Sequence, residues 1–264
     1  MIDAHVHIER GPYTFDWLMK FIESAQIRGI KELTILEHSH RFTEFKPIYE
    51  SILNHNIHGK YQTIWFNKRC SLNLSDYTNF IDETKSLDFP IKINFGLEIC
   101  YFPDHLKTIE NLVSDFDWDY LVGSIHWIDG WGFDHPKNAN YWKEININDV
   151  YLRYYELMIS LCDSGIFHTL AHPDSIKCLG FYPSIDLSTS YNELSESLKA
   201  NQMKTEFSCG LKINYQHFEL GPNQELLKAF LSNKVELVTA SDAHRPEDVG
   251  LYIDEANNII MSSH

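Results

Sequence analysis

Short apolar runs alternate with longer amphipathic stretches along most of this 264-residue chain. Short apolar runs rich in β-branched residues are typical of buried strands, and apolar positions spaced three and four apart are typical of helices. The order therefore predicts alternating strands and helices, as in a parallel sheet or barrel. Seven strands are expected, at Ile2–His7, Leu33–His38, Ile93–Ile99, Tyr120–Trp127, His168–Ala171, Lys204–Cys209 and Glu236–Ser241.

Helix signals fall between these strands. The segment Thr14–Arg28 gathers its apolar side chains on one stripe, and Gly29 follows as a helix-ending residue. The segment Asn148–Ser164 has an N-cap asparagine, an apolar face and a glycine after it. Three further signals are a capping box at Ser190–Glu193, a helix over Pro222–Asn233 and a short turn from Pro246.

The length fits one large domain spanning residues 1–264, a size common among α/β barrels. The sequence shows neither an internal repeat nor a low-complexity linker. Two connections are long, at about residues 40–75 and 128–148, and both are rich in aromatic residues. Long connections in a compact domain are usually binding loops or lids, so both are expected near a functional site.

Composition favours an intracellular globular protein. Hydrophobic residues make up 44% of the chain, yet no apolar stretch approaches the length of a membrane span. The N-terminal residues lack the basic region and apolar core of a signal peptide, which leads us to expect a cytoplasmic location. The five cysteines are scattered without a Cys-x-x-Cys pair, so we expect small buried side chains and no disulfide framework.

The formal net charge of -15 argues against nucleic acid or an anionic membrane as the main partner. It is compatible with a small anionic substrate, because bound cations can reverse the local field. The fourteen histidines are numerous for this length, and their positions matter more than their number.

Metal-binding side chains stand at the C-terminal ends of the predicted strands. The first strand ends in His5 and His7, which point to the same face because residues two apart in a strand share a face. Barrel enzymes build their active sites at these strand ends. A lone histidine after a strand is more often a hydrogen-bonded rim residue, but so many at once predict a metal site. The candidate ligands are His5, His7, Glu9, His38, Glu98, His126, His172, Asp242 and His244.

These ligand types restrict the metal. Imidazole and carboxylate without thiolate suit Zn, Fe or Mn. A catalytic zinc ion takes about three protein ligands, so eight or nine candidates indicate two or three ions. Glu98 is the natural bridging ligand, because one carboxylate offers two oxygens.

The order of these motifs resembles the polymerase and histidinol phosphatase (PHP) superfamily. The shared motifs are His-x-His, Glu-His, Gly-x-Glu, Ser-x-His, a later histidine and a final Asp-x-His, in order over almost the whole chain. The wider context resembles the stand-alone histidinol-phosphatase branch, especially at 38–42, 94–101 and 123–133.

The resemblance implies a distorted seven-stranded (β/α) barrel of TIM-like type with a trinuclear centre of divalent ions. By that likeness His5, His7, Glu98 and Asp242 hold one ion. His38 and His244, with Glu9, hold a second, and Glu98, His126 and His172 hold a third. Glu9 is where this chain departs from its relatives, several of which carry a histidine or aspartate further along the loop.

The implied activity is hydrolysis of a phosphomonoester, L-histidinol phosphate, in histidine biosynthesis. We hypothesise that a hydroxide bridging two ions attacks phosphorus in line, and that Asp242, His244 or an ordered water protonates the leaving oxygen. Candidate phosphate-binding residues are Arg41, Arg153 and Lys212, although the turn before Lys212 departs from the family pattern. For the rest of the substrate, the aromatic loop with Trp131 and Asp134 or Asp129 offers contacts to a ring and an ammonium. His40 could support a metal ligand or contact the substrate, or it could be an ordinary loop histidine.

Three alternatives remain at this point. A PHP-type enzyme could act on another small phosphate ester or on phosphotyrosine, but the loop typical of the tyrosine phosphatases is absent after His7. Metal-dependent amidohydrolases also begin with His-x-His, but they usually end with a lone aspartate after an eighth strand. A catalytically idle metal-binding protein is the third alternative.

Overall fold

Within residues 1–263, the part of the chain that this computed structural model describes, seven parallel strands form one sheet in the order β1-β2-β3-β4-β7-β8-β9. All seven predicted strands are confirmed, and the fourth ends at Ser124, earlier than expected. Their bounds are β1 Ile2–His7, β2 Glu32–His38, β3 Lys92–Cys100, β4 Tyr120–Ser124, β7 Thr169–Leu170, β8 Lys204–Ser208 and β9 Leu237–Ala240.

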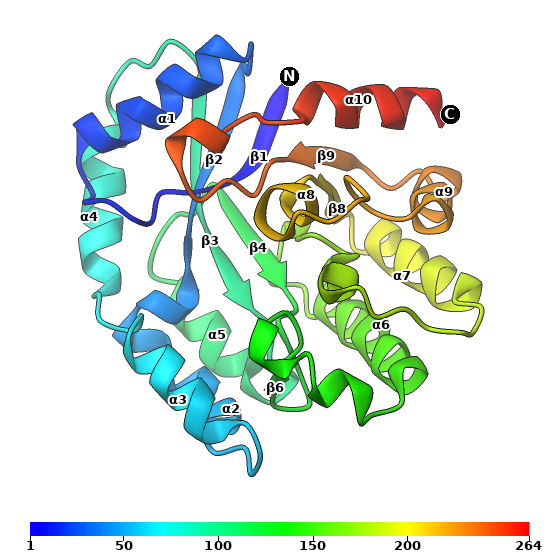
Figure 1. Ribbon diagram of the computed structural model, residues 1–264. Helices are drawn as coiled ribbons and strands as arrows, with labels where there is room; N and C mark the ends of the chain where they lie inside the picture. The colour runs from blue at the N-terminus through cyan, green and yellow to red at the C-terminus, as the bar shows by residue number, and fades with distance from the viewer. Residues whose placement is uncertain (264) are drawn as a thin grey trace.

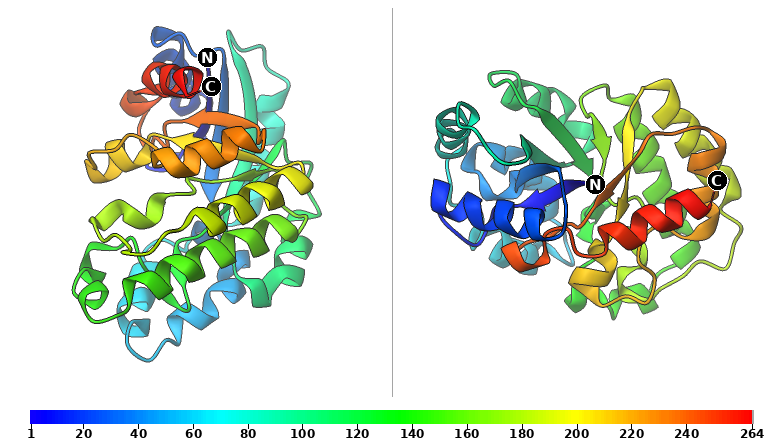
Figure 2. Two further views of the ribbon diagram at one scale, coloured as in Figure 1. Left: turned by 90° about the vertical axis from the view of Figure 1, so that its right-hand side faces the viewer. Right: turned by 90° about the horizontal axis from the view of Figure 1, so that it is seen from above.

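The sheet curls until the segment after β9 meets β1. The backbone N–H of Asp242 donates to the carbonyl of His5 at 2.9 Å, and the N–H of His7 donates to the carbonyl of Ala243 at 2.8 Å. Strand β7 has only two residues and pairs over only two positions with each neighbour, which distorts this side. The result is a nearly closed seven-stranded barrel with helices around it (Figure 1; Figure 2, right).

The helices cover the outside of the strands. The α-helices are α1 Phe15–Ile27, α2 Glu50–Leu53, α3 Gly59–Asn67, α4 Leu74–Lys85, α5 Leu106–Val113, α6 Ile147–Asp163, α7 Ser188–Ala200, α8 Gly210–Tyr215, α9 Gln224–Ser232 and α10 Ile253–Ser262. Short 3₁₀ helices lie at Ser39–Arg41, Thr43–Tyr49, Pro103–His105, Pro136–Asn138, Tyr141–Lys143, Ser175–Leu179 and Pro246–Asp248. Among the described residues, no helix is long and apolar enough to span a membrane.

Helix α1 follows its sequence signals. The Thr14 side chain accepts a hydrogen bond from the backbone of Trp17, and Gly29 has the positive φ of 72° that a helix-ending glycine supplies. The predicted capping box at Ser190–Glu193 is wrong, because α7 already begins at Ser188 and contains it. The N-cap position belongs to Leu187, whose side chain is buried in the core and so anchors the start of the helix.

The two long connections fold over the C-terminal ends of the strands (Figure 1). The first carries α2 and α3, and the second carries the hairpin of β5 (Trp127–Ile128) and β6 (Trp131–Gly132). The buried Gln62 joins them, because its amide nitrogen donates to the carbonyl of Gly130 at 2.9 Å and its oxygen accepts from the N–H of Gly132 at 3.0 Å. The two connections therefore form one wall.

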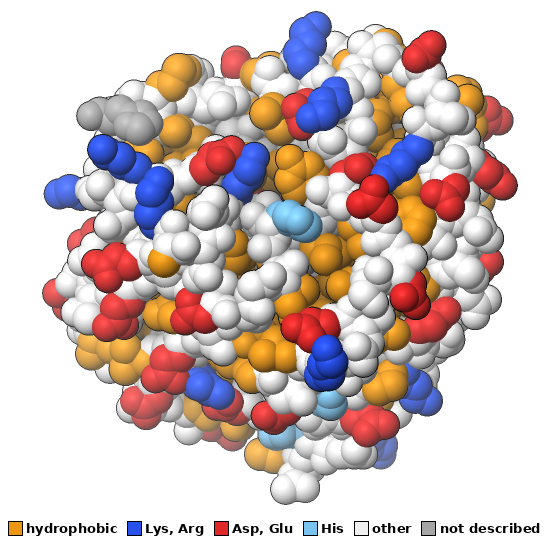
Figure 3. Space-filling view, turned by 180° about the vertical axis from the view of Figure 1, so that it is seen from behind, with side chains coloured by type: hydrophobic (Ala, Val, Ile, Leu, Met, Phe, Trp, Pro, Cys, Tyr) orange, Lys and Arg blue, Asp and Glu red, His pale blue; other side chains and the backbone are white. Residues whose placement is uncertain are grey.

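Surface charge is mixed on the face opposite the view of Figure 1. Acidic and basic side chains alternate there with exposed apolar ones (Figure 3). The acidic excess of the chain is therefore not gathered into one patch on that face. All five cysteines are unpaired and four are buried as expected, but Cys70 is partly exposed.

Asp3, on β1, links the first strand of the barrel to the segment that follows the last strand, β9. Its fully buried carboxylate accepts hydrogen bonds from the backbone N–H groups of Ser241 and Gly250, each at 2.8 Å. In an Asp3→Asn variant the amide NH₂ would face one of these donors and leave it unpaired. We expect a loss of about 1–3 kcal/mol in the free energy of unfolding, measured by urea denaturation at pH 7.

The difference in stability between wild type and Asp3→Asn should depend on pH. Burial raises the pKa of Asp3 from 3.8 to about 6, although the hydrogen bonds from Ser241 and Gly250 oppose the shift. A raised carboxyl pKa gives stability that is present below pH 3.8 and lost as the pH rises through 6. Asparagine does not titrate, so the stability gap between wild type and variant should narrow from pH 4 to pH 7. A gap that widens over this range would contradict the argument.

Candidate metal centre

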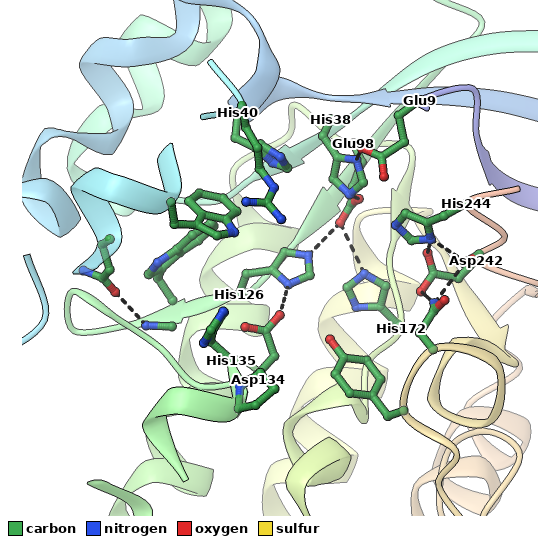
Figure 4. Close-up of a pocket in the computed structure, with 18 of the residues that line it drawn as sticks. Glu9, His38, His40, Glu98, His126, Asp134, His135, His172, Asp242 and His244 are labelled. Atoms are coloured by element: carbon green, nitrogen blue, oxygen red, sulfur yellow. Dashed lines mark hydrogen bonds and ion pairs between the residues drawn. The ribbon is translucent and has the colours of Figure 1, made fainter. Parts of the chain in front are cut away.

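The carboxylate of Glu98, near the end of β3, lies at the middle of a histidine cluster (Figure 4). Its Oε1 is 2.9 Å from His126 Nε2 and 3.2 Å from His172 Nε2. Its Oε2 faces the imidazoles of the first two strands, at 3.1 Å from His38 Nε2, 3.3 Å from His7 Nε2 and 3.6 Å from His5 Nε2. One buried carboxylate is thus approached by five imidazole nitrogens from four segments of the chain, since His5 and His7 both lie on β1.

Asp242 and His244 reach the cluster from the segment after β9. Asp242 Oδ1 lies 3.5 Å from His7 Nε2 and 3.9 Å from His5 Nε2. His244 lies beside His7, with ring centroids 4.5 Å apart and the rings tilted by 38°. Asp242 and His172 both have positive φ, 55° and 27°, in the left-handed region that non-glycine residues rarely adopt. Such backbone strain concentrates at functional sites.

Glu206 supports the cluster from β8. Its fully buried carboxylate is 2.7 Å from His5 Nδ1 and accepts from the backbone N–H of His172 at 3.0 Å. Asp134 has a similar place at the other side, 2.9 Å from His126 Nδ1 (Figure 4). A carboxylate on Nδ1 fixes the tautomer and leaves the Nε2 lone pair free for a metal. Our sequence-based ligand list did not include Glu206, although a carboxylate in an apolar strand is the signal that identified Glu98.

Gly210 allows Asp242 to take its place. A Cβ at position 210 would lie 2.2 Å from Asp242 Oδ2, and that oxygen also accepts a hydrogen bond from Asn214 Nδ2 at 3.0 Å. Gly210→Ala should therefore displace the Asp242 carboxylate. We expect bound metal to fall and any hydrolytic activity to drop by about tenfold or more, measured by elemental analysis and kinetics on the same sample.

Gly180→Ala is the matched control for that variant. Gly180 has a φ of 78° and open space around its Cβ position, so alanine adds backbone strain without touching the cluster. It should lower the melting temperature but keep the metal content. Equal metal loss in both variants would show that the Gly210 effect is only destabilisation.

Glu9 lies beside the cluster. Its Oε2 is 3.6 Å from His38 Nδ1, and Glu9 lines a cavity that opens above the cluster. The neighbouring Glu37 is buried and already engaged, since it accepts from the backbone N–H of His38 at 2.8 Å and pairs with Arg41. Glu9 is therefore the carboxylate better placed to join His38 and His244, and its role as a ligand stays a prediction.

The pKa values of the cluster residues favour a site that binds positive ions. Burial alone would raise the pKa of Glu98, but the facing His38, His126 and His172 hold it well below its usual value. Burial opposes a charge on His38, yet Glu98 and Glu9 raise its pKa to about 9. Burial and the nearby His7 lower the pKa of His244 to about 3, so its ring is neutral. Burial likewise opposes a charge on His5 and His126, but facing carboxylates raise the pKa of both, so protons on these rings and on His38 supply positive charge that a metal ion could supply instead.

Donor spacing fits shared ions. Ligands about 2.1 Å from one tetrahedral ion lie roughly 3.4 Å apart. The His5 and His7 Nε2 atoms are 2.9 Å apart and lie 3.3–3.6 Å from Glu98 Oε2. Four groups of donors are close enough to hold an ion: His5, His7 and Glu98; Glu98, His126 and His172; His7, His38 and His244; and Glu9, Glu37 and His38. Donors of the chain are therefore placed to bind metal. The second group is the same as a predicted set, and the first is a predicted set without Asp242.

The predicted substrate residues have different positions. Asp134 lines the cavity. Trp131 does not, because it is buried against Tyr141 and Trp142 in the hairpin wall. Arg153 is on the surface, paired with Asp129 and Glu156. Arg41 is turned to Glu37, and Lys212 lies on α8 outside the cavity lining.

A cavity of about 380 Å³ opens above the cluster. Most of its outer wall comes from the two long connections that the sequence places near a functional site, although most of the individual residues follow no strand and no motif singles them out. They lie on α3, on the segment after it, in the β5–β6 connection and at the end of α8: Tyr61, Gln62, Trp65, Arg69, His135, Pro136 and Tyr215. His40, which we had considered for such a role, also lines it.

A nearly closed seven-stranded barrel with imidazole and carboxylate donors at its C-terminal ends defines a metal-binding (β/α)-barrel protein. The PHP domain family matches residues 3–207, and the chain belongs to this family, which confirms the resemblance of its motifs.

Two curated relatives are similar in sequence. A protein called probable histidinol-phosphatase from Deinococcus radiodurans is 27% identical over 203 residues, which cover 73% of this chain and 74% of the relative. A protein of the same name from Schizosaccharomyces pombe is 27% identical over 175 residues, which cover 61% of this chain and 56% of the relative.

Two solved structures share the fold. Histidinol phosphate phosphatase from Lactococcus lactis, complexed with zinc, L-histidinol and phosphate, has a TM-score of 0.69 at 16% identity and covers 99% of this chain and 93% of its own. A putative histidinol phosphatase from Listeria monocytogenes has a TM-score of 0.70 at 18% identity, covering 96% and 99%. The predicted distorted seven-stranded barrel is confirmed.

Proposed function

We propose that this protein is a metal-dependent phosphomonoester hydrolase whose substrate is L-histidinol phosphate. The observation that carries the proposal is the Glu98 carboxylate, within 3.6 Å of five imidazole nitrogens below an open cavity. Membership of the PHP family and the names of the curated relatives support the same activity. A small phosphate ester also suits the size of the cavity.

We propose three divalent ions, Zn, Fe or Mn, held by the predicted ligands. His5, His7, Glu98 and Asp242 would hold the first. His38 and His244, with Glu9, would hold the second, and Glu98, His126 and His172 the third. When bound, such ions supply positive charge to the phosphoryl oxygens and a water of lowered pKa.

The protein's own residues orient this chemistry. Glu206 and Asp134 fix the His5 and His126 rings, so that each Nε2 faces Glu98. Residues of α3 and of the β5–β6 connection line the cavity above the cluster. We predicted Asp242 and His244 as proton donors to the leaving oxygen. His244 Nδ1 is 2.9 Å from the Asp242 carbonyl, which suits donation of its only proton there. We therefore propose His244 as a ligand. Against the effect of burial, histidine neighbours lower the pKa of Asp242 and favour its ionised form, so of the two remaining candidates an ordered water is the proposed donor.

The test is steady-state kinetics with L-histidinol phosphate and p-nitrophenyl phosphate, with metals counted in the same sample. We expect kcat/KM for L-histidinol phosphate to be about 100-fold higher, since specific contacts to the leaving group contribute in the transition state. If p-nitrophenyl phosphate or phosphotyrosine were turned over as fast or faster, the substrate assignment would be wrong. If the metal-loaded protein hydrolysed none of these phosphate esters, the proposal that it is a phosphatase would be wrong.

A further inference from the structure

Two cationic side chains line the cavity, Arg10 and Arg69, and neither was among the predicted phosphate-binding residues. Arg10 Nε lies 3.7 Å from the Glu9 carboxylate. For Arg69, no carboxylate among residues 1–263 lies within ion-pair distance, and no described group hydrogen-bonds its side chain. Of the two, Arg69 is the cation available to an incoming anion.

Trp65 holds Arg69 in place. The guanidinium carbon is 4.8 Å from the centre of the Trp65 ring, a cation–π distance. Stacking on a flat ring limits the conformations of a long side chain while its N–H donors stay free. Arg69 is exposed, so these donors are open to a ligand that enters the cavity.

His40 adds a polar atom on the same wall. Its ring centroid is 4.8 Å from that of Trp65 and 4.7 Å from that of the candidate ligand His38. It is 7% exposed, and its Nε2 is buried with no hydrogen-bond partner among the described residues. Figure 4 shows it beside His38 at the edge of the pocket. The rings of His38, His40 and Trp65 thus form a continuous path from the metal cluster to Arg69.

The charge of Arg69 indicates which part of the substrate it can bind. The carboxylates that line the cavity already face imidazoles: Glu9 faces His38, Asp134 faces His126, and Glu98 and Asp242 face several. L-Histidinol carries an ammonium, which a guanidinium repels. The phosphoryl group is the anionic part of the substrate, and it matches the planar guanidinium fork.

We propose that Arg69, positioned by Trp65, binds the phosphoryl group of the substrate, with His40 as a second polar contact. Arg69 takes the place that Arg41, Arg153 and Lys212 were predicted to fill. The inference deepens the proposed function and rests on it, since it assumes that a phosphate ester enters this cavity.

The experiment measures the binding of each product separately. Inorganic phosphate and L-histidinol are titrated by calorimetry into metal-loaded wild type, Arg69→Met and Arg69→Lys. For Arg69→Met we expect the Kd for phosphate to rise by about tenfold or more, and the Kd for L-histidinol to stay within about twofold or to fall. Arg69→Lys keeps the charge without the fork and should be intermediate.

Arg153→Met is the matched control, because Arg153 is a partly exposed arginine paired with Asp129 outside the cavity lining. Its Kd for phosphate should equal that of wild type. Trp65→Leu should weaken phosphate binding in the same direction as Arg69→Met, because it frees the guanidinium. If Arg69→Met is poorly folded by melting temperature, Arg69→Lys alone carries the test.

Two results would overturn the proposal. One is a Kd for phosphate unchanged in Arg69→Met and Arg69→Lys at equal metal content. The other is weaker binding of L-histidinol instead of phosphate, which would assign Arg69 to the organic part of the substrate. Calorimetry needs no turnover, so this outcome is separate from the proposed function: wild type could bind phosphate through Arg69 and still fail to hydrolyse L-histidinol phosphate.

Discussion

Replacing Glu98 by glutamine is expected to lower kcat/KM for phosphate-ester hydrolysis by about a thousandfold or more. Glutamine keeps the size of the side chain but removes the negative charge that faces five imidazoles. Its NH₂ group would point a proton at His126 and His172 or at His7 and His38, where a metal ligand needs a lone pair. The ions that share this carboxylate should be lost together.

The measurement is metal content per chain together with steady-state kinetics. Glu110→Gln provides the control, since Glu110 is an exposed glutamate on α5 that pairs only with Lys107 among the described residues. It should behave as wild type. If Glu98→Gln kept its full metal content and activity within about tenfold of wild type, Glu98 would not be a bridging ligand.

Removing the metal with a chelator is expected to abolish hydrolysis and to lower the melting temperature. The site keeps two buried carboxylates, Glu98 and Asp242, whose ionisation is favoured by their histidine neighbours. Without ions, only protonated imidazoles balance these charges. Adding back Zn, Fe(II) or Mn one at a time should restore both properties, and the ion that restores activity best identifies the working metal.

The metal-free protein should also lose stability with rising pH. Burial opposes the charge on His38, but Glu98 and Glu9 raise its pKa from 6.5 to about 9. A raised histidine pKa gives stability that is full below pH 6.5 and lost as the pH passes 9. The melting temperature of the metal-free form should therefore fall between pH 7 and pH 9, more than that of the loaded form. Parallel curves for the two forms would contradict this account of the cluster.

Much of the candidate site could be predicted from the sequence because strand ends are local features. His5-x-His7 and Asp242-x-His244 each stand directly after an apolar run, and parallel strands bring such ends to one edge. The structure brings together all nine predicted ligands, including the doubtful Glu9. Glu206 also stands in an apolar strand, so the signal that identifies Glu98 applies to its carboxylate as well.

The outer wall could not be predicted in this way. Helices α2 and α3 lie in a connection that we had expected as a loop, because their apolar positions are few and irregular. Whether an arginine points into a cavity depends on the packing of that wall. Arg153 and Lys212 were chosen by their place in the chain, and they lie outside the lining, whereas Arg69 follows no strand and lines it.

The sequence by itself determined the alternation of strands and helices, the seven strands and the ligand types at their ends, since these depend on short-range periodicity and side-chain chemistry. Only the tertiary structure decided which nitrogens face which oxygen of Glu98. The same holds for the close approach of Gly210 to Asp242 and for the pairing of Arg69 with Trp65. These contacts join residues far apart in the chain, and their geometry is set by barrel closure and packing, which no local pattern encodes.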